Sequence, residues 1–118
     1  HALHNLPITV FKGHYRSSTY VDDCVRTVAN ISDNFISGRI YNIGSDQYHS
    51  IEELADIIWN YTEAPRKLIT YKESEILTAK TKKVDIELSK RELNHKATVS
   101  LEEGVKRTIE WMKEYYRL

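Results

Sequence analysis

Glycine is scarce in this chain and is never clustered. The only four glycines among its 118 residues are Gly13, Gly38, Gly44 and Gly104. A dinucleotide-binding turn of the form G-x-G-x-x-G and the glycine-rich loop of a P-loop both need glycines within a few residues of one another, so that the backbone can approach phosphate groups. The spacing therefore excludes both loops, and we expect no cofactor-binding residue in this chain.

Cysteine, long apolar runs and excess charge are also missing. Cys24 is the only cysteine, so the chain forms no internal disulfide, which suits a reducing cytosol. No apolar run approaches the roughly 18 residues of a membrane-spanning helix, and no secretory signal is recognisable. Lysine plus arginine and aspartate plus glutamate both number 17, so no overall field attracts nucleic acid or an anionic membrane. We expect a cytoplasmic protein that binds neither.

The residues also offer little for a metal site. His1 and His4 would share one face of a helix, but two histidines without a third ligand do not complete a zinc site. The one local basic run, residues 80–83, is interpreted as a solvated loop. We therefore predict no metal ion.

The composition that is present is that of an ordinary soluble globular protein, with 41% hydrophobic and 29% charged residues. One domain over residues 1–118 is expected, long enough to bury about two-thirds of the surface of its unfolded chain.

Three longer helices are predicted from apolar residues that recur every three or four positions. The first runs from Tyr20 to about Asn34, and its stripe is expected to be buried, with Cys24 as a structural thiol. The other two open at Ser50 and Ser100, each the first residue of an S-x-x-E capping box. The apolar stripes are Val21, Cys24, Val25, Val28 and Ile31; Ile51, Leu54, Ile57, Ile58 and Tyr61; and Leu101, Val105, Ile109, Met112 and Tyr116.

Three short strands are predicted from β-branched and aromatic residues, at Ile8–Phe11, Arg39–Ile43 and Leu68–Tyr71. A polar, irregular loop follows over residues 72–83, long enough to be functional. A short helix is predicted over Asp85–Leu93, with Ile86 and Leu93 as its buried residues. The fold class is therefore α/β, with a few short strands covered by three longer helices.

Trp111 and Tyr115 flank the apolar stripe of the last helix. We expect both rings at the edge of the core rather than in a cofactor site.

Four segments of the chain resemble one enzyme family. Residues 16–23, Arg-Ser-Ser-Thr-Tyr-Val-Asp-Asp, are similar to the Arg-Asp-Phe-Val-Tyr-Val-Asp-Asp segment of the extended short-chain dehydrogenases/reductases that act on nucleotide sugars, the epimerases and dehydratases. Residues 40–45 are similar to the Tyr-Asn-Ile-Gly-Ser strand and turn of that family, and the resemblance continues in residues 89–93 and 99–104. It covers nearly all of this chain, but only the last third or so of such an enzyme.

The resemblance implies the C-terminal, sugar-nucleotide-binding portion of an NAD- or NADP-dependent enzyme similar to dTDP-glucose 4,6-dehydratase or UDP-glucose 4-epimerase. The glycine-rich loop and a catalytic Tyr-x-x-x-Lys pair lie upstream in that family, and no tyrosine here has a lysine four residues later. The Rossmann core is therefore absent, and this chain alone is predicted to be inactive, with no catalytic residue. The implied partners are a nucleotide-diphosphate sugar and an N-terminal Rossmann domain.

Arg16 matches the family arginine that binds the diphosphate of the substrate. A planar, permanently charged guanidinium suits phosphate oxygens. The residues alone also allow the ordinary interpretation, in which Arg16 is a surface arginine and Asp22 or Asp23 only caps the helix that follows.

Further substrate-binding candidates are Val10, Phe11 and Ser50. In the family, the run that corresponds to Val10 and Phe11 lies against the nucleotide base, although here its link to Arg16 is two residues shorter; both residues are equally compatible with a place in the core. Ser50 aligns with a position that approaches the nucleoside, and plain helix capping is the alternative. Asn42 is interpreted as a structural turn residue.

One departure from the family concerns a second phosphate-binding arginine. Counting back ten residues from Asp85 places Glu75, an acid, at that position. Lys80, Lys82 or Lys83 would be the replacement cation in the same loop.

The rival hypothesis is a small stand-alone α/β interaction or nucleotide-binding module without catalysis. In either case the predicted strand at residues 39–43 leaves an unpaired edge, and such edges recruit partners. We therefore expect some self-association, with a homodimer as the simplest form.

Overall fold

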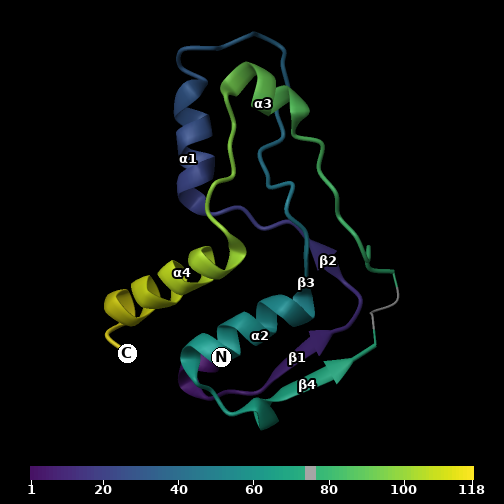
Figure 1. Ribbon diagram of the computed structural model, residues 1–118, viewed down its shortest axis with the longest axis vertical. Coiled ribbons are helices and arrows are strands. Elements are labelled where there is room, and N and C mark those ends of the chain that lie inside the picture. The colour runs from purple at the N-terminus through teal and green to yellow at the C-terminus, as the bar shows by residue number, and fades with distance from the viewer. Residues whose placement is uncertain (74–76) are drawn as a thin grey trace.

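The computed structural model describes residues 1–73 and 77–118, which form an α/β fold of short strands and four α-helices (Figure 1). Three of these helices are longer than the fourth, as the sequence predicts. In chain order the elements are η1 (Ala2–His4), β1 (Ile8–Phe11), β2 (Tyr15–Arg16), α1 (Val21–Asn30), β3 (His49–Ser50), α2 (Ile51–Thr62), η2 (Arg66–Leu68), β4 (Ile69–Lys72), α3 (Glu87–Leu93) and α4 (Leu101–Tyr116).

Strands β1 and β4 form a parallel pair at one end of the molecule, in register from Ile8 opposite Ile69 to Phe11 opposite Lys72. Helix α2 packs against β1, and α4 packs on α2 (Figure 1). Trp59 is 2% exposed at the centre of this body and packs with Ala2 and Ala64. The apolar core therefore lies where α2, η1 and the strand pair meet.

Strands β2 and β3 form a second, antiparallel pair, with Arg16 opposite His49 and Tyr15 opposite Ser50. The segment after residue 77 runs along the other side of β2, where the Tyr15 N–H donates to the Lys80 carbonyl at 2.7 Å. The three segments hold Arg16 in a fixed place next to the start of α2.

Helices α1 and α3 pack together at the other end of the molecule around a polar core (Figure 1). Asp23 is 1% exposed, and its carboxylate accepts hydrogen bonds from the backbone N–H groups of Thr98 and Val99 at 2.9 and 3.0 Å. It also accepts from the Thr98 hydroxyl and from Arg26. This aspartate therefore links α1 to the segment that precedes α4. Its role goes beyond capping the first turn of α1, the ordinary interpretation of Asp22 or Asp23.

His95 links the same polar core to the chain before β3. Its Nε2 donates to the Gly44 carbonyl at 2.5 Å, and its Nδ1 lies 2.7 Å from Thr27 Oγ1. Both side chains are at most 2% exposed. Leu93, at the end of α3, is fully buried beside them, and Ile86 is 5% exposed, as predicted.

The two serine caps are confirmed. Ser50 Oγ accepts from the Glu53 N–H at 3.0 Å at the start of α2, and Ser100 Oγ accepts from the Glu103 N–H at 3.2 Å at the start of α4. Each bond satisfies a backbone donor that the helix itself leaves without a partner.

The predicted burial of the first helix is wrong. Its inward face carries Asp23 and Thr27, whereas Val21, Val25 and Val28 are 60%, 59% and 55% exposed. Cys24 is only half-buried, although burial and the nearby Asp23 still raise the pKa of its thiol. The stripe is helical in period, but no segment within the described ranges covers it.

The predicted strand at Arg39–Ile43 is also wrong. Those residues are irregular in this structure, and Ile40 is 85% exposed. A strand needs a neighbour to receive its backbone hydrogen bonds, and none of the described residues provides one for this segment. The third strand is present but runs from Ile69 to Lys72, because Leu68 belongs to the short helix η2.

The last helix is amphipathic but more exposed than predicted. Of its apolar stripe only Ile109, 6% exposed, is buried, and Tyr116 is 56% exposed. Trp111 and Tyr115 were expected at the core edge, but they are 54% and 66% exposed and stack on each other with ring centroids 5.2 Å apart. The C-terminal half of α4 extends beyond the body that it packs on (Figure 1).

Candidate functional site

Arg16 is held by two backbone carbonyls. Its Nη1 donates to the carbonyl oxygen of Tyr15 at 2.7 Å and to that of Lys80 at 3.1 Å. The side chain is partly buried, so it is not an extended surface arginine. Among the described residues, both contacts use the one terminal nitrogen Nη1.

Arg16 and Phe11 line one pocket of about 220 Å³. Two strands, the start of α2 and the segment after residue 77 build its wall. Thr9 and Phe11 lie on the same face of β1, because side chains two residues apart in a strand share a face. Within the described ranges, the lining consists of Thr9, Phe11, His14, Arg16, Ile51 and Thr78.

The other two predicted substrate-binding residues lie beside this pocket and not in its lining. The side chain of Val10 points to the opposite face of β1 from those of Thr9 and Phe11, is 2% exposed and does not line the pocket. Ser50 is the β3 residue opposite Tyr15, and its hydroxyl caps α2. Ile51, the next residue, does line the pocket and donates its N–H to the His14 carbonyl at 2.9 Å.

His14 is a pocket residue that the sequence analysis missed. It is 4% exposed, and its Nε2 has no hydrogen-bond partner among the described residues. The available signal was its position two residues before Arg16 in an extended segment, which predicts that both side chains share a face. Its burial, however, depends on the pairing of distant segments.

His49 lies opposite Arg16 in the β2–β3 pair and is also buried. Its Nε2 lies 3.1 Å from the hydroxyl of Ser18. Burial lowers the pKa of this imidazole, and the carboxylate of Glu53 only partly opposes that effect. The lowered pKa favours a neutral His49, whose contact with Ser18 links β3 to the segment that follows β2.

The loop that was expected to supply a second phosphate-binding cation meets Arg16 through its backbone. The carbonyl of Lys80 accepts from Arg16, and the N–H of Lys82 bonds to the Tyr15 carbonyl at 3.4 Å. Lys83 lines a different hollow, with Tyr48 and Lys90. The position of Glu75 lies outside the described residues.

Asn42 and Gly44 organise the turn that passes next to the Arg16 segment. The Asn42 side chain donates to the Asp85 carbonyl at 3.0 Å, which fits the predicted structural role. A side chain at Gly44 would meet Ile86 at 3.5 Å and the Ser17 hydroxyl at 3.9 Å, so this turn packs closely on the residue after Arg16.

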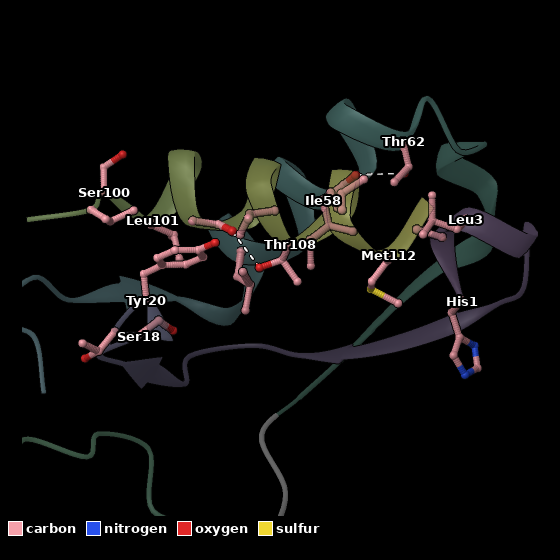
Figure 2. A pocket seen from close by; sticks show the side chains of 17 residues that line it. His1, Leu3, Ser18, Tyr20, Ile58, Thr62, Ser100, Leu101, Thr108 and Met112 are labelled. Atoms are coloured by element: carbon pink, nitrogen blue, oxygen red, sulfur yellow. Dashed lines mark hydrogen bonds between the residues drawn. The ribbon is translucent and has the colours of Figure 1, made fainter. Parts of the chain in front are cut away.

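A second, apolar groove of about 290 Å³ lies between α2, α4, η1 and residues 18–20 (Figure 2). The hydroxyls of Thr62 and Thr108 in its lining donate to their own helices, to Ile58 and Gly104 carbonyls at 2.8 Å each. The groove has mostly apolar side chains, such as Leu101 and Met112. None of the predicted substrate-binding residues lines it.

Two further observations concern what the chain could bind. No group of three or more histidine, cysteine, aspartate or glutamate side chains in the described ranges is arranged to hold a metal ion. No helix in that part of the chain is long and apolar enough to cross a membrane.

Curated proteins of known activity match most of this chain. It is 31% identical over 104 residues to a UDP-N-acetyl-α-D-glucosaminuronate decarboxylase of Bacillus cytotoxicus. The aligned region covers 84% of this chain and 32% of the decarboxylase. It is 30% identical over 118 residues to a UDP-glucuronate 4-epimerase of Thermodesulfobacterium geofontis. This alignment covers 95% of this chain and 35% of the epimerase. In sequence, this chain is therefore similar to the C-terminal part of nucleotide-sugar epimerases and of a nucleotide-sugar decarboxylase. It spans about a third of the length of those relatives. No protein-family model matches it.

Solved structures of such enzymes share the fold. An epimerase of Methanothermobacter thermautotrophicus superposes with a TM-score of 0.87 at 28% identity, over 98% of this chain and 35% of its own. A UDP-glucuronic acid 4-epimerase of Bacillus cereus, solved with UDP-glucuronic acid and NAD, gives a TM-score of 0.79 at 25% identity, over 98% of this chain and 40% of its own. The predicted resemblance to NAD-dependent nucleotide-sugar enzymes is thus confirmed.

Proposed function

We propose that this chain is the sugar-nucleotide-binding part, the C-terminal domain, of an NAD-dependent nucleotide-sugar epimerase or dehydratase. The observation that carries the proposal is the pocket shared by Arg16 and Phe11, in a chain whose relatives act on UDP-sugars. Arg16 would hold the diphosphate, because its guanidinium is anchored through Nη1 and, within the part of the chain that the structure describes, makes no hydrogen bond through its other nitrogens. Phe11 would pack against the nucleoside.

The chain's contribution to catalysis is orientation. A diphosphate bound to one fixed cation places the attached sugar at a set distance and angle. Such positioning can lower the activation free energy of a reaction by several kcal/mol. The stand-alone module without catalysis has no observation in its favour, since the relatives compared above are enzymes.

NAD is bound in the Bacillus cereus structure. The residues of this chain do not fit that cofactor, because its glycines are too scattered to form a backbone cradle for a dinucleotide pyrophosphate. We therefore assign NAD to no residue here. A Rossmann domain would hold it, and that domain is the partner we propose for the exposed α1 face. We propose a cytoplasmic location and a homodimer as the simplest assembly.

Calorimetric titration with UDP and UDP-glucuronic acid tests the proposal. Arg16→Gln should weaken the binding of both by roughly 10- to 100-fold, the usual effect of losing a charge-assisted contact. Arg91→Gln is the matched control, because Arg91 is exposed on α3 and, among the described residues, bonds to its neighbour Glu92 alone. Equal binding by Arg16→Gln and the wild-type chain would overturn the phosphate role.

A further inference from the structure

His14 combines burial with an unused hydrogen-bonding atom. The residue is 4% exposed, yet its Nε2 has no partner among the described residues. A buried polar atom without a partner costs free energy comparable to a lost hydrogen bond, so such atoms are rare outside ligand sites. Its backbone, by contrast, is used, because the His14 carbonyl accepts the N–H of Ile51.

His14 is one of the residues that line the Arg16 pocket. His14 and Arg16 flank Tyr15, and alternation along the extended chain puts them on one face while Tyr15, 47% exposed, lies on the other. The pocket thus has two nitrogen-bearing side chains from one segment, opposite the Thr9 and Phe11 face of β1.

The charge of the lining favours an anion. Among the lining residues that the structure describes none is acidic, and Arg16 is permanently positive. The nearest acidic side chain along α2, Glu52, accepts the Gly13 N–H at 2.8 Å and is not in the lining. A ligand oxygen in this pocket would therefore meet donors.

We propose that His14 Nε2–H donates to a phosphate oxygen of the bound nucleotide diphosphate and is the second phosphate contact beside Arg16. The proposal rests on the proposed function, and it names a residue for the role that the loop lysines were expected to fill. The start of α2 contributes little, because the Ile51 and Glu53 N–H groups already bond to the His14 carbonyl and the Ser50 hydroxyl.

Two variants of the full chain separate a hydrogen bond from simple packing. His14→Leu keeps an apolar body but has no donor, whereas His14→Gln keeps an N–H donor on a side chain of similar reach. With UDP and with inorganic pyrophosphate as probes, His14→Leu should weaken binding about tenfold, and His14→Gln should stay within about threefold of wild type. Uridine, which lacks phosphate, should bind all three proteins equally.

Thermal melting of each variant establishes that it is folded, and the imidazole ¹⁵N shift of wild-type His14 gives a readout that needs no variant. Addition of pyrophosphate should shift the Nε2 resonance in the wild type and not in Arg16→Gln.

Each outcome has one meaning. Loss of UDP binding in Arg16→Gln together with normal binding in His14→Leu overturns the His14 contact and leaves the proposed function standing. Loss of uridine binding in His14→Leu assigns His14 to the nucleoside and also overturns it. Normal binding in both Arg16→Gln and His14→Leu, or no UDP binding by the wild type, overturns the proposed function and this inference together.

Discussion

Asp23 is a charged group in a place that excludes water. Its carboxylate accepts hydrogen bonds from two backbone N–H groups, a hydroxyl and the guanidinium of Arg26. Asn keeps one acceptor oxygen but places an NH₂ donor against the donors that the second carboxylate oxygen satisfies, and it removes the charge, so Asp23→Asn should lower the free energy of unfolding by about 2–4 kcal/mol. Urea denaturation measures the loss.

The neighbouring residue provides the control for that substitution. Asp22 is exposed in the same first turn of α1, so Asp22→Asn should cost less than about 1 kcal/mol. Equal losses for the two variants would show that Asp23 acts only through the helix dipole.

The same carboxylate predicts how stability depends on pH. Burial alone raises the pKa of Asp23, but the hydrogen bonds from Val99, Thr98 and Arg26 outweigh it, and the pKa lies below its ordinary value of 3.8. A carboxyl whose pKa is lower in the folded state stabilises the fold above its unfolded pKa, and that contribution is lost as pH falls through the folded pKa. Wild type should therefore lose stability more steeply below about pH 4 than Asp23→Asn does. Parallel acid titration curves, followed by circular dichroism, would contradict this.

At the scale of single elements, α2 and α4 begin with the same cap in different surroundings. Ser50→Ala and Ser100→Ala should each lower the free energy of unfolding by about 1 kcal/mol, since each removes one bond to an N3 N–H group. Only Ser50 lies next to the Arg16 pocket. If Ser50 also approaches the nucleoside, Ser50→Ala should weaken UDP binding at a concentration where both variants are fully folded, and Ser100→Ala should not.

These caps show what local chemistry can predict. A serine three residues before a glutamate forms its bond within one turn, so the sequence suffices to locate the starts of α2 and α4. The buried residues at the two ends of α3, Ile86 just before it and Leu93 at its end, were also predictable, because their spacing of seven residues is that of one helix face and α3 does pack against α1. The candidate arginine came from motif resemblance, and the structure adds that it shares a pocket with Phe11.

Elements that no described residue covers or pairs with were not predictable in the same way. The stripe of α1 has the correct period, but Val21 and Val25 are exposed because periodicity identifies an apolar face and not what covers it. The segment 39–43 has strand-like residues but no neighbouring strand. His14 was missed for the opposite reason, since its burial arises from β3 and the chain after residue 77, which are far from it in sequence.

The whole molecule exposes more surface than its size requires. It measures 50 × 38 × 18 Å and has a radius of gyration of 16.8 Å, whereas a compact chain of this length has about 13–14 Å. Its accessible surface is 8267 Å², against roughly 6,600 Å² for a compact protein of this mass. The excess includes the apolar face of α1, which a partner would bury.

In this chain by itself, without the Rossmann domain proposed to cover that face, self-association is therefore expected to depend on the α1 face. In sedimentation velocity runs the chain should show a rising mean mass with concentration, and the double variant Val25→Lys and Val28→Lys should remain a monomer. Both valines are more than half exposed, so the change in unfolding free energy should stay within about 0.5 kcal/mol for each.

Ile40→Lys separates this surface from the open segment at 39–43. If that variant alone abolishes association, the irregular segment recruits the second copy and the α1 face does not. A wild-type chain that stays monomeric at high concentration would contradict both.

The pairing of β1 with β4 has a consequence for the order of folding. Ile8 meets Ile69 across about 60 residues of intervening chain, and closing such a loop costs roughly 3–4 kcal/mol in entropy before the strands gain their contacts. Thr9 and Phe11, on one wall of the Arg16 pocket, should therefore reach their places late, after the helices have formed. UDP should slow unfolding in stopped-flow experiments while leaving the refolding rate unchanged. A site that is completed only after the transition state for folding does not bind the ligand in that state, so the ligand stabilises the native state alone.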